Sequence, residues 1–315
     1  MMVTEHPDHN LLDMASPEPL ESIHPGVSSL LNKIGMAGVE IKPTKSTYDG
    51  IYSDGNYTAL GEDVSGPWLG LHLNRRIFNA QLLQRMKTMD VEIRFAEKVE
   101  DFITDKGKVI GIKTTTDELL ATYVIDASGK KAIAGKKLKF KSQFFSPPLA
   151  CWTGISAIFD TYPFDSRSSH FYSNPNGWTW LAPYPPHYCS WTRLSIKGEK
   201  DLSQPVEIKN YHVFGKVQFA NMRWRMYRPV CSEGILLCGD AAGILDPAAG
   251  QGIFNALWSG IEAGNTAVSC IQQPGMAAFH LAAYDDWFVR QFEEKVRKLG
   301  EYYRKYGIAI TTDCI

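Results

Sequence analysis

One glycine-rich segment carries the residue types that bind a ligand through backbone amides and a carboxylate. Residues 239–253 have the sequence GDAAGILDPAAGQGI, and a short apolar run, 235–238, leads into them. Gly250 and Gly252 open a stretch whose apolar residues recur every four positions, which predicts a helix. Free N–H groups at a helix N-terminus suit an anion or an electron-rich ring, and glycine lets a ligand approach the backbone. Asp240, at the carboxyl end of the expected strand, is placed to accept hydrogen bonds from a sugar-like hydroxyl.

The elements around this segment follow from periodicity. Helical spacing predicts helices near both ends of the chain, and alternation predicts strands and a hairpin between them. Aromatic and β-branched residues with scattered prolines then predict a mostly antiparallel sheet. The expected elements are helices at 26–35, after Asn74, after Gly252 and at 279–306, strand and hairpin at 91–116, a strand at 123–129 and the sheet at 140–225.

The composition excludes several classes of protein. The 315 residues contain 33 Lys and Arg against 34 Asp and Glu, so no overall field favours nucleic acid. The six cysteines form no C-x-x-C pair, which argues against a zinc site or a disulfide framework. No apolar window is long enough for a membrane span and no signal peptide is visible, so the expected location is the cytoplasm.

The glycine-rich segment resembles the second flavin motif of one superfamily. Gly-Asp-Ala-Ala-Gly followed by Asp-Pro-x-x-Gly-x-Gly-Ile is similar to that motif in para-hydroxybenzoate hydroxylase-type monooxygenases, geranylgeranyl reductases and flavin-dependent halogenases. The resemblance implies FAD as the cofactor. It places Asp240 at the ribityl and pyrophosphate region, and the Pro247, Gly250 and Gly252 turn against the isoalloxazine ring. Gly239 and Gln251 belong to the same motif and are expected in the cofactor site.

Three weaker similarities add candidate residues. Asp126 and Gly129 end the strand at 123–129 and resemble the Asp-x-x-Gly that packs beside the cofactor, although a plain β-turn has the same pattern. Arg75 resembles the arginine that starts a helix and points at the flavin, although exposed arginines before helices are common. Glu21-Ser22-x-x-Pro25 resembles the Glu-Ser-x-x-Pro stretch near the ring.

The first dinucleotide motif expected from the resemblance is missing from this sequence. No Gly-x-Gly-x-x-Gly occurs, and Glu5 takes the position of the acidic residue that binds the adenosine ribose. The sequence thus looks as though its first β-α unit were cut away, and we expect FAD binding to be weak or to need an upstream segment or a partner. A non-catalytic flavin-fold remnant, or a truncated reading frame, stays open as an alternative.

The substrate side is expected on the antiparallel sheet. The sequence GWTWLAP, at 177–183, resembles a Gly-Trp-x-Trp-x-x-Pro pattern that also occurs in tryptophan halogenases, and Trp178, Trp180 and Trp152 are the candidate pocket residues. Each is as readily a core residue. The halogenase lysine would align with Tyr48 or Asp49, and Lys45 is out of register, which argues against halogenation. No histidine has metal-ligand spacing, so no metal site and no catalytic residue is assigned.

The predicted fold class is α/β: an N-terminally incomplete FAD/NAD(P)-binding Rossmann-like lobe, an inserted antiparallel substrate sheet and a C-terminal helical segment. The expected function is an FAD-dependent oxidoreductase, first a monooxygenase acting through a flavin hydroperoxide on a hydrophobic or aromatic substrate or an aromatic side chain on a carrier. Alternatives are a reductase of prenyl double bonds or a halogenase-like enzyme, and a reductase partner is a possible electron source. The expected boundaries are 1–139 and 229–272 for the FAD-binding lobe, 140–228 for the substrate lobe and 273–315 for the C-terminal segment.

Overall fold

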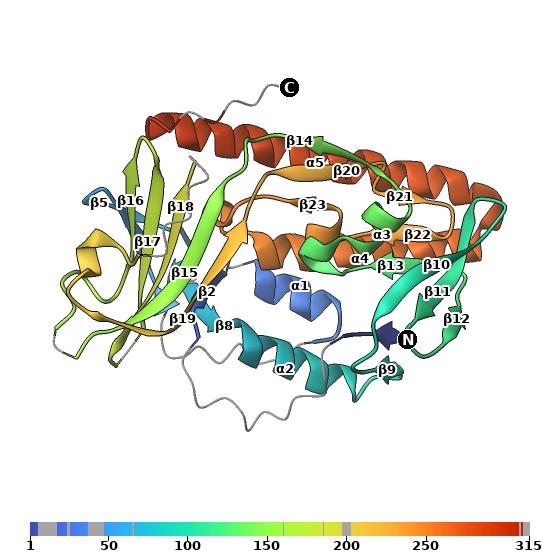
Figure 1. The fold of residues 1–315 in the computed structure, drawn as a ribbon, viewed down its shortest axis with the longest axis horizontal. Coiled ribbons are helices and arrows are strands. Elements are labelled where there is room, and N and C mark those ends of the chain that lie inside the picture. The colour runs from blue at the N-terminus through green and yellow to red at the C-terminus, as the bar shows by residue number, and fades with distance from the viewer. Residues whose placement is uncertain are drawn as a thin grey trace.

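A computed structural model describes most of the chain, and Figure 1 shows its arrangement. A large sheet forms one end of the molecule, shorter strands and a hairpin form the other, and the helix α5 runs along both. Pro25, Lys45 and Cys314 lie outside the described residues. The described residues are 1–5, 18–23, 26–36, 47–64, 66–159, 161–184, 186–196, 203–308 and 310, without the side chain of Ala249.

Short parallel strand pairs form the core of the α/β half. β1 (Met2–Val3) pairs in parallel with β9 (Ile93–Arg94), and β13 (Val124–Asp126) pairs in parallel with β22 (Ile235–Leu237). β21 (Cys231–Ser232) adds an antiparallel edge to β22. β22 is buried along its whole length, and its sequence, Ile-Leu-Leu, is the continuous apolar run typical of a central strand. In the described residues the β1 pair and the β13 group are separate sheets.

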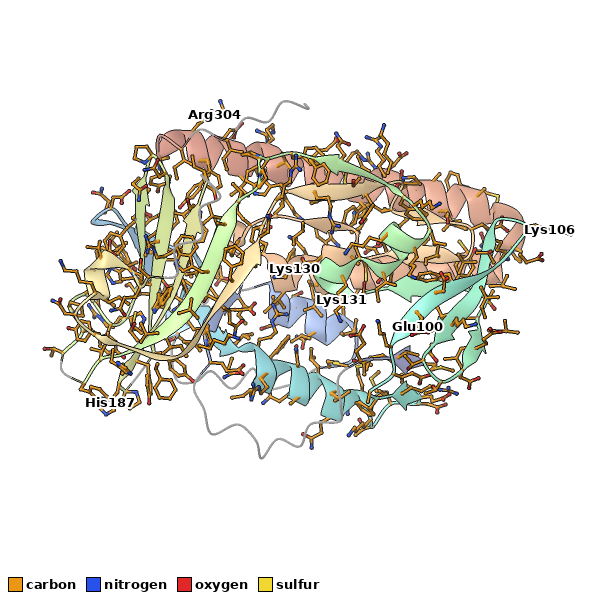
Figure 2. All side chains as sticks on the ribbon, viewed as in Figure 1. Glu100, Lys106, Lys130, Lys131, His187 and Arg304 are labelled. Atoms are coloured by element: carbon orange, nitrogen blue, oxygen red, sulfur yellow. The ribbon has the colours of Figure 1, made fainter. Side chains whose placement is uncertain are left out.

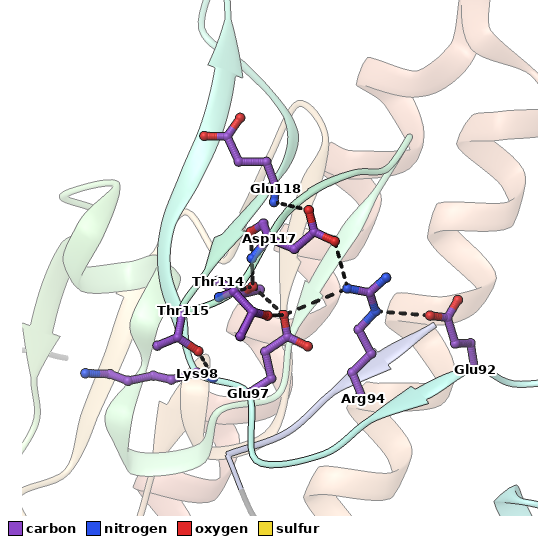
Figure 3. Close-up of polar contacts among 9 residues, drawn as sticks. Glu92, Arg94, Glu97, Lys98, Thr114, Thr115, Asp117 and Glu118 are labelled. Atoms are coloured by element: carbon purple, nitrogen blue, oxygen red, sulfur yellow. Dashed lines mark hydrogen bonds and ion pairs between the residues drawn. The ribbon is translucent and has the colours of Figure 1, made fainter.

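A three-stranded antiparallel hairpin sheet lies beside these strands. It consists of β10 (Val99–Asp105), β11 (Lys108–Thr114) and β12 (Glu118–Leu120). A polar cluster joins it to β9, as Figure 3 shows: Arg94 donates to Asp117 over 3.1 Å, and the buried Glu97 accepts hydrogen bonds from two threonine hydroxyls, those of Thr114 and Thr116. We interpret this cluster as structural, since each carboxylate is hydrogen-bonded within the fold.

The large sheet has seven strands in the order β19-β15-β18-β17-β16-β4-β5. All neighbouring strands are antiparallel except β16 and β4, so the predicted mostly antiparallel sheet is present. Its strands are β15 (Ala150–Ala157), β16 (Ser169–Asn174), β17 (Gly177–Tyr184), β18 (Tyr188–Ser195), β19 (His212–Asn221), β4 (Gly50–Ser53) and β5 (Asn56–Ala59). Two of these strands, β4 and β5, come from the segment assigned by sequence to the first lobe, because a parallel pairing with β16 draws them into this sheet.

The remaining strands connect the two ends of the molecule. One small sheet carries residues of the candidate site, and a second one joins the segments before and after the large sheet. The first is β2 (Leu20–Ile23), β8 (Gly70–Asn74) and β3 (Thr47–Tyr48), the second is β14 (Lys141–Phe144), β20 (Arg225–Arg228) and β23 (Gly243–Ile244), and β6 (Glu62–Asp63) pairs with β7 (Gly66–Pro67).

The helices begin and end close to the predicted positions. Asn74 caps α2 by accepting from the backbone of Arg76 at 2.9 Å and of Ile77 at 3.2 Å. Gly35, in the left-handed region at φ +69°, follows the end of α1. The helices are α1 (Val27–Lys33), α2 (Arg75–Met86), α3 (Ile133–Lys137), α4 (Gly252–Gln272) and α5 (Ala277–Lys305), with 3-10 turns η2 (Gly129–Lys131), η3 (Val206–Ile208), η4 (Gly239–Ala241), η5 (Pro247–Ala249) and η6 (Pro274–Met276).

The long C-terminal helix packs on both halves of the molecule. Near its start the Tyr284 hydroxyl donates to the Leu237 carbonyl at 2.7 Å, and near its end Tyr302 packs edge-on against Phe171 of the large sheet. The helix α5 therefore packs on both lobes. None of the described helices is both long and apolar enough to cross a membrane.

Candidate functional site

The Gly-Asp turn leaves one mostly buried carboxylate without a protein donor. β22 ends beside β13, and Gly239 turns the chain in the left-handed region at φ +55°, where its N–H donates to the Ser259 hydroxyl at 2.8 Å. This bond ties the turn to α4. Within the described residues no group donates a hydrogen bond to the Asp240 carboxylate, and burial raises its pKa. A carboxylate in this condition is available to hydroxyl groups of a ligand.

Positive charge surrounds Asp240. The cations Lys130, Arg75 and Arg225 act against the rise of its pKa, whereas Glu21 adds to it. Arg225 also donates to the Asp240 backbone carbonyl at 3.2 Å. Figure 2 shows Lys130 near the middle of the molecule, between its two ends. Three cations around one carboxylate give the site a net positive character, which suits a ligand that carries both hydroxyls and phosphates.

The sequence expects Arg75 to point at the ring. The structure places it at the start of α2, where its Nε donates to Glu21 Oε1 at 2.9 Å across the β2-β8 pair. Both side chains remain substantially exposed. Arg75 therefore lies within electrostatic reach of Asp240, held by Glu21, and its contact with a flavin stays a prediction.

The turn from Pro247 to Gly252 presents open backbone. Pro247 begins η5, Gly250 adopts φ +60°, and Gln251 makes no side-chain cap at the start of α4. A Cβ added at Gly250 or Gly252 would meet no atom within 4 Å. Because these two glycines have no side chain, the space in front of the turn is open. A flat ligand needs such space to approach the backbone closely.

Two glycines further along α4, Gly260 and Gly264, also face open space. A Cβ at either position meets no atom within 4 Å, so no neighbour uses that space in the described residues.

The sequence analysis missed the network behind the turn. Asp246, which precedes Pro247, is almost fully buried and accepts hydrogen bonds from Trp224 Nε1 at 2.6 Å and from the Tyr303 hydroxyl at 2.8 Å. An Asp before Pro is a recognisable helix-start signal, and Asp246 does cap the backbone of Ala248 at 2.9 Å. No local pattern indicates its two aromatic donors, which are 22 and 57 residues away.

The Asp-x-x-Gly at the end of β13 is satisfied within the fold. Asp126 accepts from the backbone N–H of Ser128 at 2.8 Å and of Ala134 at 2.7 Å. Gly129 is in the left-handed region at φ +62° with open space around it. Asp126 thus shapes the turn that carries Lys130, and a direct contact of Asp126 with a cofactor stays a prediction.

Glu5 follows β1 and forms an ion pair with Lys131 of η2. This pair links the carboxyl ends of β1 and β13, which belong to separate sheets. The position is the edge where a parallel sheet binds nucleotides. The role of Glu5 at a ribose stays a prediction.

The three candidate tryptophans do not share one surface. Trp178 is buried in the main core, where its Nε1–H donates to the Tyr303 hydroxyl at 2.7 Å. Trp152 lies in a second core on the opposite face, with Trp191, and its Nε1–H donates to the Ser203 carbonyl at 3.2 Å. Grouping Trp152 with Trp178 in one pocket wall is therefore wrong, because side chains alternate between the faces of a strand and these two project to opposite sides.

Trp180 lies beside a second feature that the sequence analysis missed, a histidine cluster. The His72 ring lies edge-on to Trp180 with centroids 5.5 Å apart and is stacked on Tyr48 at 4.4 Å. Its two nitrogens lie 3.1 Å from the hydroxyls of Ser22 and Ser169. Burial lowers the pKa of His72 to about 3, so the ring is neutral at pH 7.

This cluster contains Tyr48, which is one of the two positions that align with the lysine of halogenases. Burial raises the pKa of Tyr48, which keeps the phenol protonated. The aromatic members of the cluster are uncharged at pH 7. His72, Tyr48 and Ser22 lie in the same small sheet as Glu21, which pairs with Arg75, whereas Trp180 and Ser169 come from the large sheet. A substrate contact of Trp180 stays a prediction.

Several known proteins are similar to this chain in sequence. No protein-family model matches the chain. The digeranylgeranylglycerophospholipid reductase of Methanosphaerula palustris is 25% identical over 296 residues, covering 81% of this chain and 73% of the relative. The digeranylgeranylglycerophospholipid reductase 2 of Methanococcoides burtonii is 26% identical over 254 residues, covering 75% of this chain and 62% of the relative. The chain thus spans less than two thirds of the length of some of these relatives.

Solved structures share the fold. A geranylgeranyl bacteriochlorophyll reductase-like protein from Thermoplasma acidophilum superimposes with a TM-score of 0.77 at 18% identity, covering 98% of this chain and 81% of that one. The flavin-dependent halogenase CmlS superimposes with a TM-score of 0.76 at 14% identity, covering 99% and 63%. In sequence the chain is similar to digeranylgeranylglycerophospholipid reductases, and in fold to a flavin-dependent halogenase and a reductase-like protein. These are the kinds of protein that the glycine-rich segment resembles, and the predicted α/β fold class is confirmed.

The open turn and Asp240 belong to one segment of the chain. Asp240 and the Pro247–Gly252 turn, the two features that the sequence assigned to the flavin, lie near the two ends of the segment between β22 and α4, which also contains the short strand β23. Ser259 anchors the start of this segment and Asp246 its middle. In open α/β sheets, ligands bind beyond the carboxyl ends of the strands, which is where this segment begins.

Proposed function

We propose that the protein is an FAD-dependent reductase of carbon–carbon double bonds in an isoprenoid lipid. The observation that carries this proposal is the similarity of about four fifths of the chain to a digeranylgeranylglycerophospholipid reductase, at 25% identity. Monooxygenation, the first expectation from sequence, becomes the second candidate. The non-catalytic alternative has less support, because the curated relatives are named as enzymes.

The residues present fit the flavin half of FAD. Asp240 offers a mostly buried carboxylate with no donor in the described part of the chain, and Gly250 and Gly252 leave open space before uncapped helix amides. Lys130 and Arg225 supply positive charge for a diphosphate. The Gly-x-Gly-x-x-Gly that holds the adenosine diphosphate half in dinucleotide folds is absent from the printed sequence. We therefore assign this chain the flavin and ribityl contacts.

Reduced FAD, if bound, would supply a hydride equivalent to one carbon of the double bond, and a proton from the medium would add to the other carbon. The chain's own residues then bind and orient the substrate. Trp180, which is partly exposed, is the proposed contact for an apolar isoprenoid chain, with the uncharged rings of the buried His72 and Tyr48 packed behind it.

Oxygenation and halogenation are the other two candidate reactions at this site. The similar fold of CmlS favours neither, since a fold shared at 14% identity carries no reaction with it. The two positions that align with the halogenase lysine are Tyr48, which is stacked on His72, and Asp49, so neither carries a lysine.

The test is an anaerobic incubation of the protein with FAD, dithionite and a geranylgeranyl-chain phospholipid, followed by mass spectrometry. We expect the lipid to gain two hydrogens per reduced double bond. In a parallel aerobic incubation with NADH and a flavin reductase, a product that gains an oxygen atom would replace the proposal with monooxygenation. A lipid unchanged in both incubations would reject both functions.

A pair of tryptophan variants locates the substrate surface. Trp180→Ala is expected to lower lipid turnover while FAD affinity stays within twofold of the unmodified protein. Trp152→Ala is the matched control, since it lies on the opposite face of the sheet. Equal loss of turnover and FAD binding in Trp180→Ala would show that Trp180 is structural.

A further inference from the structure

The most completely buried acidic group in the site is the carboxylate behind the flavin turn. Asp246 is 2% exposed, and three donors converge on its two oxygens. Trp224 Nε1 and the Tyr303 hydroxyl both bind Oδ2, at 2.6 and 2.8 Å, and the Ala248 backbone N–H binds Oδ1 at 2.9 Å. One oxygen thus fixes the backbone of the turn, while the other is held by two aromatic side chains.

The same network reaches the substrate sheet. Tyr303, near the end of α5, accepts a hydrogen bond at 2.7 Å from Trp178 Nε1 while it donates to Asp246. Trp178 is the second residue of β17, in the centre of the seven-stranded sheet. Three side chains therefore connect the sheet, the C-terminal helix and the turn that is expected to hold the flavin.

The charge of Asp246 is not neutralised by an ion pair. Among the described residues, no cation contributes to the pKa of Asp246, and its partners are the three hydrogen-bond donors. The titratable groups that face it are Tyr303 and Cys151, and burial raises the pKa of both, so they are neutral at pH 7. Burial raises the pKa of Asp246 to about 6, and its three hydrogen bonds limit the rise. Asp246 is thus mostly an anion at pH 7.

A buried anion beside a redox group opposes the addition of negative charge to that group, because the surrounding medium screens it poorly. Asp246 is adjacent in sequence to Pro247, the first residue of the turn. Three donors fix the position of its carboxylate. Its negative charge would therefore stay at a fixed place relative to a flavin ring held against the turn.

We propose that Asp246 is a positioning residue that fixes the Pro247–Gly250 turn and lowers the reduction potential of a flavin held there, with Tyr303 and Trp178 tying it to the substrate sheet. The proposal rests on the proposed function, since it supposes that a flavin binds this turn. It adds a residue and a role that the glycine-rich motif does not assign.

The first arm of the test measures the midpoint potential of FAD bound to the protein at pH 7. Asp246→Asn is expected to favour the reduced flavin about tenfold, which is about 30 mV for a two-electron couple. Tyr303→Phe is expected to shift the potential in the same direction by less. Tyr302→Phe removes a hydroxyl from the neighbouring position of α5 and is expected to leave the potential unchanged. An unchanged potential in Asp246→Asn with FAD bound would overturn the proposal.

The second arm needs no flavin. Carbon-13 NMR of the Asp246 carboxyl gives its pKa in the flavin-free protein and in Tyr303→Phe, which is conservative enough to keep the fold. We expect a higher pKa in Tyr303→Phe and no change in Tyr302→Phe. Equal values in all three proteins would reject the network. Should the unmodified protein bind no FAD, the proposed function fails and the redox role with it, and this titration still decides whether Tyr303 tunes Asp246.

Discussion

Two aspartates at the ends of neighbouring parallel strands have nearly the same sequence context and opposite surroundings. Asp126 ends β13 and is followed by Ala-Ser-Gly, and Asp240 follows β22 and is followed by Ala-Ala-Gly. Asp126 accepts hydrogen bonds from the backbone of Ser128 and Ala134, at 2.8 and 2.7 Å. Asp240 accepts none from the described residues, and burial raises its pKa.

The difference separates a carboxylate that stabilises the fold from one that the fold leaves for a ligand. Two charge-assisted bonds offset the desolvation of Asp126. Asp240 is desolvated without such bonds, so its charge opposes folding until a ligand supplies donors. Buried ionisable groups with shifted pKa values are typical of functional sites. The sequence pattern Asp-x-x-Gly alone does not tell the two roles apart.

The largest expected effect is on the Asp126 side of this comparison. Asp126→Ala is expected to lower the free energy of unfolding by about 4 kcal/mol, because two buried N–H groups lose a charged acceptor. Asp240→Ala is expected to leave it unchanged or raise it. Urea denaturation followed by circular dichroism measures both. Equal destabilisation by the two variants would erase the distinction.

Asp246 adds a third case to this comparison. Its carboxylate accepts hydrogen bonds, as that of Asp126 does, and burial nevertheless raises its pKa. A folded-state pKa of about 6, above the ordinary 3.8, gives a contribution to stability that is present below pH 4 and lost as the pH rises through 6. Relative to Asp246→Asn, the protein should therefore lose about 3 kcal/mol of stability between pH 4 and pH 8, at about 1.4 kcal/mol per pKa unit. Denaturant midpoints at several pH values measure this difference. A constant difference between the two proteins would contradict the raised pKa.

Removing the charge of Asp240 is expected to weaken FAD binding without destabilising the fold. Asp240→Asn is expected to weaken FAD binding about 10- to 100-fold, the usual effect of losing a charged hydrogen-bond acceptor. Quenching of flavin fluorescence measures the affinity. Asp286→Asn, an exposed carboxylate on α5, is the matched control and should bind FAD like the unmodified protein. Equal affinities in all three proteins would exclude Asp240 from the site.

The smallest effect on stability is expected at the open glycines. Gly252→Ala meets no atom within 4 Å and begins α4 at an ordinary φ, so the free energy of unfolding should change by less than about 0.5 kcal/mol. FAD affinity should nevertheless fall, because the added methyl occupies space needed by the ring. Gly264→Ala, equally open and further along the same helix, should not affect affinity. A normal FAD affinity in Gly252→Ala would mean that the ring lies elsewhere.

Local patterns predicted the elements of the fold but not their partners. Asn74 before α2 and Gly35 after α1 mark helix ends through bonds made within a few residues, so they are visible in sequence. The addition of β4 to the large sheet depends on its pairing with β16, more than 100 residues away, and no short pattern encodes it. The separate faces of Trp152 and Trp178 likewise depend on the register of β15 and β17.

The candidate site shows the same division. Asp240 and the Pro247–Gly252 turn were predictable, because glycine and helix-start chemistry are local. Tyr303 and His72 were not, since Tyr303 meets Asp246 from α5 and His72 meets Ser169 from another sheet. Neither lies in a motif, and their roles come from burial and long-range contacts.

Hydrogen–deuterium exchange of the protein with and without saturating FAD tests the central claim most directly. If the segment between β22 and α4 holds the flavin, FAD should slow exchange at the amides of residues 250–254, and this protection should weaken in Asp240→Asn. Protection confined to other segments, or none at all, would contradict the assignment of this segment as the flavin site.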